Sequence, residues 1–490
     1  MPSGDLHSVS DVQDAVVTVM GLGRFKQGSG VGAAKWLLRH GAQIVVTDLK
    51  SEKDLKESVD LVTEWYEKYR AEYPDRAIYA PVFRLGQHQE EDFVNVQLVV
   101  KNPDVPKESA YVQTAEKAGV RVESDVSLFL HFYPHPAIAV TGTRGKSTTT
   151  ALIGEMLKGV NPKTVVAGNI MHSPLEELDW MLEEKQPVPV ALEMSSWLLE
   201  SLGHMSRGFD ISVLTNVSED HLDRYASFES YIAAKELVFR NQTTEQKAVL
   251  NYDHPIVRTV GDRVKSERFW FSKQPLPIGI NGTYIDPMGD LYVRIGEEQR
   301  KFCHVSEWPA LQGEHNVENA LAATLVAVLS GVPDAHICET LRTFEGLPGR
   351  QQTVREFDSV TYVNDTNATS PEGTMAALKR FGDAGKKHIV LIVGGKGKGS
   401  KFDDMAKMVR EYCKHVVYLE GTATDEIEQL IGNEIQASYA ASMDEAVKAG
   451  RATAKPGDIV LMSPATASFG MFKNAYDRGG QFVEAVKNLT

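Results

Sequence analysis

Short apolar runs alternate along the chain with stretches whose apolar positions recur every three or four residues. The first run, Ala15–Met20, leads into glycines; a helical pattern follows over Ala33–Arg39, and a second run, Ile44–Thr47, ends at Asp48. Apolar runs with strand propensity that are separated by a helical pattern predict a β-α-β unit, whose two strands are parallel. The chain therefore begins with an α/β arrangement.

The same alternation returns further along the chain. Apolar runs at Val360–Val363, Ile389–Val393, Val416–Leu419 and Ile459–Met462 are separated by helical patterns. The pattern predicts a second, mostly parallel sheet near the C-terminus. Because 490 residues exceed what one hydrophobic core organises, we expect three α/β domains, at 1–134, 135–346 and 347–490. Proline-containing segments at 131–136 and 344–350 supply the boundaries and are candidate hinges.

Composition narrows the class of protein. The net charge of −14 opposes binding to nucleic acid or anionic lipid, and no apolar run is long enough to cross a membrane, so we expect no membrane insertion. The cysteines, Cys303, Cys338 and Cys413, are too far apart for a CxxC metal site or a disulfide framework. The N-terminus lacks the pattern of a secretion signal. We therefore expect a cytoplasmic protein.

The first glycine turn indicates an anionic ligand. Gly21 and Gly23 follow the first strand and Asp48 ends the second, as in dinucleotide-binding units. The intervening loop is longer and more basic than that fingerprint allows, with Arg24 and Lys26 before the next glycine. The pattern therefore favours a phosphate-bearing ligand without redox chemistry, and we hypothesise that Arg24 or Lys26 meets its diphosphate.

A second glycine loop indicates a nucleotide triphosphate. The apolar run 138–140 is followed by Thr141-Gly142-Thr143-Arg144-Gly145-Lys146-Ser147-Thr148. A strand, a glycine loop and a helix start wrap backbone N–H groups around phosphates, while the lysine meets the β and γ phosphates and the serine hydroxyl binds Mg²⁺. Val140 stands where the strict pattern has its first glycine. Even so, this spacing after a strand predicts a phosphate-binding loop.

Two acidic stretches could serve the metal of that loop. Glu193 ends the apolar run of Ala191-Leu192 and can point toward the phosphates at the carboxyl edge of a sheet. The stretch 213–223 passes from a strand into a polar cluster that includes His221. Alone, a glutamate at a strand end is more often a surface residue or a helix cap. Beside a phosphate loop, the metal-binding interpretation is favoured.

These motifs, in this order, resemble the Mur ligases, which build the peptide stem of bacterial cell-wall precursors. The matching segments are the loop 141–147, Gly168-Asn169, Leu192-Glu193 with Ser195-Ser196, 216–223, Ala234-Lys235, 313–320, 347–350, Asn364-Asp365, 394–398, and 463–468. The resemblance covers nearly the whole chain. It implies an ATP- and Mg²⁺-dependent ligase with a Rossmann-like N-terminal domain for a UDP-sugar, a central P-loop ATPase domain and a Rossmann-like C-terminal domain for an amino acid.

The resemblance also implies roles for individual residues. ATP would be held by Gly142, Thr143, Arg144, Gly145, Lys146, Ser147, Thr148, Asn316, Asn319, Arg350 and Asp365. Two Mg²⁺ ions would be served by Ser147, Glu193, His221 and Lys235, the last carbamylated by CO₂. Lys146, Glu193, His221 and Lys235 would be catalytic. The substrates would meet Gly23, Arg24, Lys26, Asn169, Ser195, Ser196, Thr369, Lys398 and Ser468.

Within the family, the segment 463–474 followed by Arg478-Gly479 resembles the members that add D-glutamate to UDP-N-acetylmuramoyl-L-alanine. We therefore expect these two substrates and ATP as the partners of a monomer. Three positions differ from that branch: Asn367 replaces a lysine, Ala475 an aromatic residue and Leu198 a glutamine. Lys396, Lys398 and Lys401 are candidates to replace the lost charge.

Three other interpretations remain open. The first is a Mur ligase that adds a different amino acid. The second is an enzyme like folylpolyglutamate synthase, although that relative lacks a separate nucleotide-sugar domain before the phosphate loop. The third is a non-catalytic nucleotide-binding switch, which would not need Glu193, His221, Lys235, Arg350 and Asp365 together.

Overall fold

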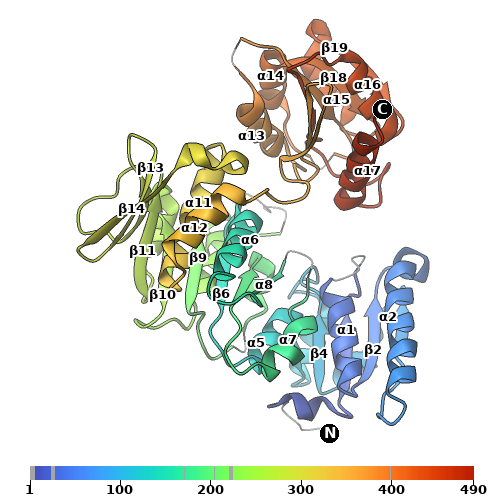
Figure 1. The fold of residues 1–490 in the computed structure, drawn as a ribbon. Helices are drawn as coiled ribbons and strands as arrows, with labels where there is room; N and C mark the ends of the chain where they lie inside the picture. Colours follow the sequence, from blue (N-terminus) through green and yellow to red (C-terminus); the bar gives the residue numbers. More distant parts are fainter. Residues whose placement is uncertain are drawn as a thin grey trace. The chain divides into compact units, whose positions relative to one another are not determined.

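Figure 1 shows a computed structural model of the chain, which describes residues 6–23, 28–169, 172–203, 205–219, 224–383, 385–397 and 399–490. The chain divides into two compact units. The first contains Met1–Trp308 and Glu314–Arg342, and the second contains Pro309–Gly313 and Thr343–Thr490. No helix among these described residues combines the length and apolarity that crossing a membrane requires.

The first unit begins with a five-stranded parallel sheet in the order β3-β2-β1-β4-β5. Its strands are β1 Val16–Met20, β2 Gln43–Asp48, β3 Val82–Leu85, β4 Leu98–Lys101 and β5 Arg121–Glu123. Its helices are α1 Ser29–Arg39, α2 Glu52–Glu72, α3 Glu91–Val94, α4 Ala110–Lys117 and α5 Asp125–Phe132. This is the Rossmann strand order without a sixth strand, so the expected Rossmann-like N-terminal fold is confirmed.

A nine-stranded sheet forms the rest of the first unit, in the order β14-β13-β12-β11-β10-β9-β6-β8-β7. Its parallel strands are β6 Ile138–Thr141, β7 Val165–Gly168, β8 Val190–Glu193, β9 Ile211–Leu214, β10 Lys247–Asn251, β11 Glu267–Ser272 and β12 Gly282–Ile285. Strands β13 Asp290–Ile295 and β14 Glu298–His304 extend it as an antiparallel hairpin. Its helices are α6 Lys146–Leu157, α7 Leu175–Glu183, α8 Ser196–Glu200, α9 Phe228–Glu236, α10 Pro255–Gly261, α11 Glu314–Leu329 and α12 Asp334–Thr343.

The two sheets of the first unit share one hydrophobic core. Trp36 of α1 is fully buried in it, together with Leu178 of α7. The Trp36 indole Nε1 donates a hydrogen bond to Asp179 Oδ1 over 2.9 Å. The same carboxylate forms hydrogen bonds with the side chains of Arg39 and His40, each over 2.8 Å. Helix α1 therefore packs on the first sheet and is also hydrogen-bonded to α7, which precedes strand β8 of the second sheet.

The second unit contains a six-stranded sheet in the order β15-β16-β20-β17-β18-β19. Strands β15 Gln352–Phe357 and β16 Val360–Asn364 are antiparallel, while β17 Ile389–Val393, β18 Cys413–Leu419, β19 Gln436–Ala440 and β20 Ile459–Met462 join β16 in parallel. One apolar cluster packs α13 Pro371–Phe381, α14 Asp403–Tyr412 and α15 Thr424–Ile431 on one face, and a second packs α16 Met443–Thr453 and α17 Ala475–Lys487 on the other. The mostly parallel C-terminal sheet is confirmed.

Candidate active site

The loop between β6 and α6 has the backbone of a phosphate-binding loop. Gly142 and Gly145 have φ angles of +151° and +83°, which side-chain-bearing residues rarely adopt. A Cβ on Gly142 would lie 1.9 Å from Thr215 Oγ1, and one on Gly145 would lie 2.2 Å from Asn319 Oδ1. Only glycine fits at these two positions. The loop ends at Lys146, the first residue of α6, where the N–H groups of the first helical turn and the helix dipole favour an anion.

Residues that follow β9 hold this loop in shape. The N–H groups of Thr143 and Arg144 donate to the backbone oxygen and to the side-chain Oδ1 of Asn216, each over 2.9 Å. Thr215 Oγ1 donates in return to the Arg144 carbonyl over 2.7 Å. These hydrogen bonds hold the loop in its glycine-dependent conformation, which suits phosphate binding.

Two lysine side chains converge on one carbonyl of the loop. Lys146 Nζ donates to the carbonyl oxygens of Gly142 and Thr143 over 3.0 and 2.9 Å. Lys235, near the end of α9, is only 2% exposed, and its Nζ donates to the same Gly142 oxygen over 2.8 Å. Lys235 Nζ also lies 4.6 Å from the centre of the Tyr231 ring. The structure thus brings together two sequence-predicted lysines and the phosphate loop.

Glu193 lies beside the start of the loop. It ends β8 and is paired in register with Val140 of β6. Asn169 Nδ2 donates to Glu193 Oε1 over 3.0 Å, and this carboxylate is 2% exposed. Its other oxygen, Oε2, is buried and has no hydrogen-bond partner among the residues that the structure describes.

A buried carboxylate oxygen that accepts no hydrogen bond is suited to bind a cation, because burying a charged oxygen without a partner costs free energy. Ser147, 7% exposed in the first turn of α6, supplies a hydroxyl oxygen of the kind that Mg²⁺ accepts. Three or more His, Cys, Asp or Glu side chains do not cluster as a metal site anywhere in the described ranges. Mg²⁺ typically keeps water and substrate phosphates among its ligands, so a sparse protein donor set suits it. His221 lies outside the described residues.

Helix α11 packs against α6 and approaches the loop at Gly145. Asn316 and Asn319 are 8% and 5% exposed, and Asn319 Oδ1 accepts a hydrogen bond from Thr149 Oγ1 of α6 over 3.3 Å. Asn319 therefore contacts the helix that begins at the phosphate loop.

Ser195 Oγ caps α8 by accepting a hydrogen bond from Leu198 N over 3.2 Å, which gives this predicted substrate residue a structural role as well.

At the N-terminal sheet, the turn after β1 is held by its neighbours. Leu22 N donates to Asp48 Oδ2 over 3.0 Å, and Ser58 Oγ donates to the Gly23 carbonyl over 2.8 Å. A Cβ on Gly30 would lie 2.4 Å from the Gly21 carbonyl, so the start of α1 packs directly against the turn. Helix α1 consequently begins at Ser29, earlier than the predicted Ala33. Arg24 and Lys26 lie outside the described residues.

In the second unit, Asp365 follows β16 at the carboxyl edge of the sheet. Its Oδ2 accepts from Ser463 Oγ over 2.7 Å and its Oδ1 from Gln351 N over 3.1 Å. Burial raises the pKa of Asp365 to about 7, although these hydrogen bonds and the charges of Arg350 and Arg380 oppose the rise. Asp365 is therefore a buried carboxyl that titrates near neutral pH.

Two loops of the same edge carry the predicted amino-acid site. Lys396 and Ala467 exchange backbone hydrogen bonds of 3.1 Å, which join the turn after β17 to the segment after β20 that contains Ser468. Ser468 is 6% exposed, and Thr369 N donates to the Asn367 carbonyl over 2.9 Å in the loop after β16. Lys398 lies outside the described residues.

Sequence reasoning did not single out Thr215 or Arg380, both of which support these sites. Thr215 directly follows an apolar strand and precedes the Asn216 motif, a position that could have indicated it. Arg380 Nη1 donates over 3.1 Å to Oε1 of Gln351, the residue whose backbone N–H donates to Asp365. It lies at the end of an amphipathic helix, where a basic residue is ordinary, so the sequence holds no signal for its role.

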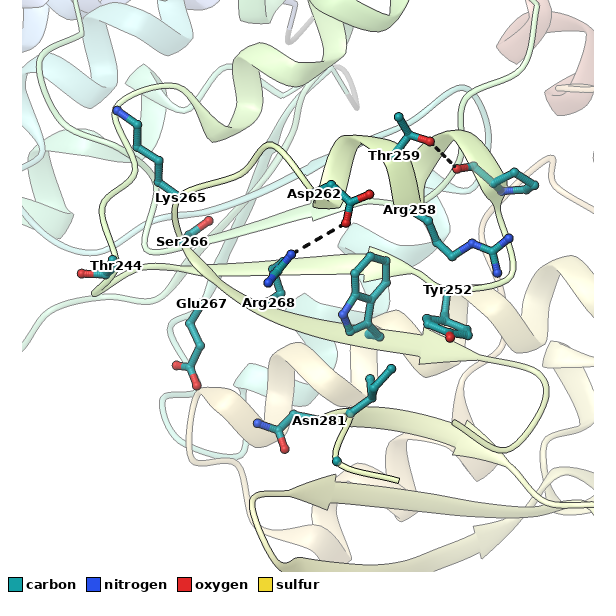
Figure 2. Close-up of a pocket in the computed structure, with 14 residues that line it drawn as sticks. Thr244, Tyr252, Arg258, Thr259, Asp262, Lys265, Ser266, Glu267, Arg268 and Asn281 are labelled. Carbon is teal, nitrogen blue, oxygen red and sulfur yellow. Dashed lines mark hydrogen bonds and ion pairs between the residues drawn. The ribbon is translucent and has the colours of Figure 1, made fainter. Parts of the chain in front are cut away.

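A pocket of about 980 Å³ lies on the nine-stranded sheet between α10 and β11 and contains none of the candidate residues (Figure 2). Arg268 and Asp262 line it 3.9 Å apart, and Thr259 Oγ1 donates to the Pro255 carbonyl over 3.2 Å. Arg258 stacks on Tyr252 with its guanidinium carbon 5.4 Å from the ring centre. These side chains already pair among themselves, so the pocket is no rival to the phosphate loop.

Known proteins resemble the chain over nearly its whole length. It is 39% identical to a UDP-N-acetylmuramoylalanine–D-glutamate ligase of Roseiflexus sp., covering 96% of this chain and 98% of the relative. The enzyme of the same name from Clostridioides difficile is 33% identical over 98% of this chain and 100% of its own.

Solved structures share the fold. The UDP-N-acetylmuramate-alanine ligase of Thermotoga maritima superposes with a TM-score of 0.58 at 19% identity, over 96% of this chain and 99% of that one. A pseudomurein peptide ligase of type C from Methanothermus fervidus gives 0.55 at 16% identity, over 97% and 100%.

Residues 140–327, which contain the phosphate loop, Glu193 and Lys235, match the Mur ligase middle domain. Residues 349–466, which contain Asp365 and Ser463, match the Mur ligase glutamate ligase domain. With both domains and full-length relatives above 30% identity, the chain belongs to the Mur ligase family of ATP-dependent ligases.

Proposed function

We propose that this protein adds D-glutamate to UDP-N-acetylmuramoyl-L-alanine with ATP and Mg²⁺, in the synthesis of peptidoglycan precursors. The observation that carries the proposal is the near full-length identity of 39% to a relative named for this reaction. The preorganised phosphate loop beside the unpaired oxygen of Glu193 supports the ATP-dependent chemistry.

The reaction has two steps. A carboxylate oxygen of UDP-N-acetylmuramoyl-L-alanine attacks the γ-phosphorus of ATP, and ADP leaves, which gives an acyl phosphate. The amino nitrogen of D-glutamate then attacks the carbonyl carbon, phosphate leaves, and the nitrogen loses a proton as the amide forms. ATP is needed because an amine does not displace oxide from a carboxylate at a useful rate. The protein contributes mainly position and electrostatics.

In this proposal the phosphate loop holds ATP. The residues assigned to the nucleotide are Gly142, Thr143, Arg144, Gly145, Lys146, Ser147, Thr148, Asn316, Asn319, Arg350 and Asp365. The Lys146 ammonium, which lies on the loop carbonyls, is positioned to exchange them for phosphate oxygens. Ser147, Glu193, His221 and carbamylated Lys235 are assigned to two Mg²⁺ ions, which would neutralise phosphate charge when bound.

The surroundings of Lys235 support its carbamylation. Its ammonium and that of Lys146 donate to one carbonyl oxygen, so two like charges lie close together in a buried place. Carbamylation needs the neutral amine, which is the form that attacks CO₂. The amine nitrogen would bond to the carbon of CO₂ and release a proton. A carboxylate would then replace a positive charge beside the phosphate loop.

The remaining assignments concern the two other substrates. Gly23, Arg24, Lys26, Asn169, Ser195 and Ser196 are assigned to the UDP-sugar substrate, and Thr369, Lys398 and Ser468 to D-glutamate. The boundaries 1–134, 135–346 and 347–490, a monomeric state and a cytoplasmic location complete the proposal.

The proposal is tested by phosphate release from MgATP with UDP-N-acetylmuramoyl-L-alanine. D-glutamate, L-glutamate, L-alanine and no amino acid are compared. Release that depends on D-glutamate supports the proposal. Release with another amino acid keeps the ligase and replaces the amino-acid assignment, while no release with any of them contradicts the proposal.

The assignment of the N-terminal turn is tested separately. Replacing Arg24 and Lys26 together with alanine should raise the KM for the UDP-sugar, because two cations near a diphosphate are lost, and leave the KM for ATP unchanged. An unchanged KM for the UDP-sugar would remove both residues from the site.

A further inference from the structure

Arg478 is a fully buried arginine in the first half of α17. Its Nε donates to Thr366 Oγ1 over 3.1 Å, its Nη2 to the Thr366 carbonyl over 2.8 Å and its Nη1 to the Thr466 carbonyl over 3.2 Å. Thr366 belongs to the loop after β16 and Thr466 to the loop after β20, and these strands are parallel neighbours. One guanidinium therefore ties together two loops at the carboxyl edge of the C-terminal sheet.

The surrounding packing makes this connection specific. Thr366 Oγ1 donates to the Ala475 carbonyl over 2.7 Å, so the same loop is bonded to the start of α17. A Cβ on Gly479 would lie 2.7 Å from Thr366 Cγ2, so helix and loop approach as closely as glycine permits. The fork of an arginine fits this arrangement because its donors diverge in a fixed plane, which a lysine cannot reproduce.

The charge of Arg478 is buried and has no ion-pair partner among the described residues. Burial raises the pKa of the nearby carboxyl, Asp365, to about 7, which weakens its ability to offset the guanidinium charge at neutral pH. A guanidinium has five N–H donors, of which three are used here. A buried cation is costly unless something offsets it, and an anionic ligand at this sheet edge would do so.

We propose that Arg478 is a positioning residue for an incoming acidic amino acid: it sets the spacing of the loops that carry Thr369 and Ser468 and favours a carboxylate side chain through its buried charge. The inference rests on the proposed function, which places the amino acid at these loops.

The test compares R478M, R478K and the control R355M. Arg355 also donates to backbone carbonyls of α17, but at its far end, at Val486 and Lys487 over 3.2 and 3.0 Å. R478M should raise the KM for D-glutamate by about tenfold and reduce the preference for D-glutamate over D-glutamine, with the KM values for ATP and the UDP-sugar unchanged. R478K should keep the preference, since it keeps the charge, while its KM for D-glutamate rises. R355M should match the parent.

The outcomes separate the inference from the proposed function. If the parent protein adds D-glutamate and R478M folds with an unchanged KM for D-glutamate and an unchanged preference over D-glutamine, the inference is refuted. The proposed function then stands. Equal rises in all three KM values, or the same effect in R355M, also refute the inference, because they indicate general loosening. If R478M does not fold, R478K decides, and an unchanged KM for D-glutamate refutes the inference. A parent that adds a neutral amino acid, or none, refutes both proposals.

Discussion

Replacing Asp365 with asparagine should stabilise the C-terminal unit, and the gain should grow with pH. The side chain is buried between Ser463 Oγ and Gln351 N. Asparagine has the same shape: its Oδ1 can accept from Gln351, and its Nδ2 can donate to Ser463 Oγ, which still reaches Thr374 Oγ1 at 3.0 Å. The variant keeps the hydrogen bonds and removes a buried charge.

The size of the effect follows from the pKa of Asp365, which burial raises from 3.8 to about 7. Between these values the folded protein holds a proton that the unfolded chain has lost, so its stability falls as pH rises toward 7 and is then constant. A difference of about three pH units, at about 1.4 kcal/mol each, corresponds to about 4 kcal/mol. D365N has no carboxyl to ionise and does not lose this stability. Its free energy of unfolding should therefore equal that of the parent near pH 4 and exceed it by the full amount above pH 7.

The assay must report on the second unit. All six tryptophans lie at or before Trp308, so the second unit, Pro309–Gly313 and Thr343–Thr490, contains none. Indole fluorescence therefore does not report on its unfolding. Hydrogen exchange of peptides covering β17 and β20, measured by mass spectrometry, gives the local free energy of opening. D444N is the control, because Asp444 lies on the same sheet's α16 with 57% of its side chain exposed.

A D365N variant that is no more stable than the parent at about pH 8.5, or a gain of equal size at about pH 5 and about pH 8.5, would refute this reasoning. The variant should at the same time lose ligase activity, because Asp365 is assigned to the nucleotide. Gain of stability with loss of activity would identify Asp365 as a residue retained for function at the expense of folding.

Three further changes test the first unit. E193Q should weaken the apparent Mg²⁺ affinity by about 100-fold in phosphate release, because the unpaired carboxylate oxygen becomes an amide. K235A should lose activity and regain part of it with acetate or formate, whereas K235R should not respond. Burial opposes ionisation of Asp179, but hydrogen bonds from His40 and Arg39 outweigh it and lower the pKa of Asp179 to about 2. D179N should therefore cost about 2 kcal/mol in urea unfolding followed by tryptophan fluorescence at neutral pH.

Each of these has a decisive contrary result. Unchanged Mg²⁺ dependence in E193Q would remove Glu193 from the metal site. No recovery of K235A with any short carboxylate would contradict the carbamate. The contribution of ionised Asp179 to the free energy of unfolding should be present above about pH 4 and be lost as pH falls toward about 2. If D179N lowers the free energy of unfolding at pH 7 by less than about 0.5 kcal/mol, the anchoring of α1 to α7 by Asp179 is contradicted.

The phosphate loop could be predicted because its signals are local. Strand β6, the glycines and Lys146 are adjacent in the chain, and left-handed backbone at Gly145 directly requires the residue that stands there. Likewise the parallel strands β17 and β20 appear with their predicted bounds, since continuous apolar runs mark strands buried on both faces.

The remaining features depend on contacts between distant segments. Helix α1 starts at Ser29 although glycines weaken a helix, because Gly30 is needed for the close approach to Gly21. The roles of Thr215, Arg380 and Arg478 arise from partners up to 112 residues away, as for Arg478 and Thr366. No periodicity in the sequence records such pairings.

The carbonyl oxygen of Gly142, which accepts hydrogen bonds from both Lys146 and Lys235, also bears on affinity for ATP. When a nucleotide arrives, Lys146 must release bonds that it already has, so binding is an exchange of partners and only the difference between the two sets contributes. Moderate affinity is then an expected property of the loop. It suits an enzyme that must discharge ADP after every amide bond it makes.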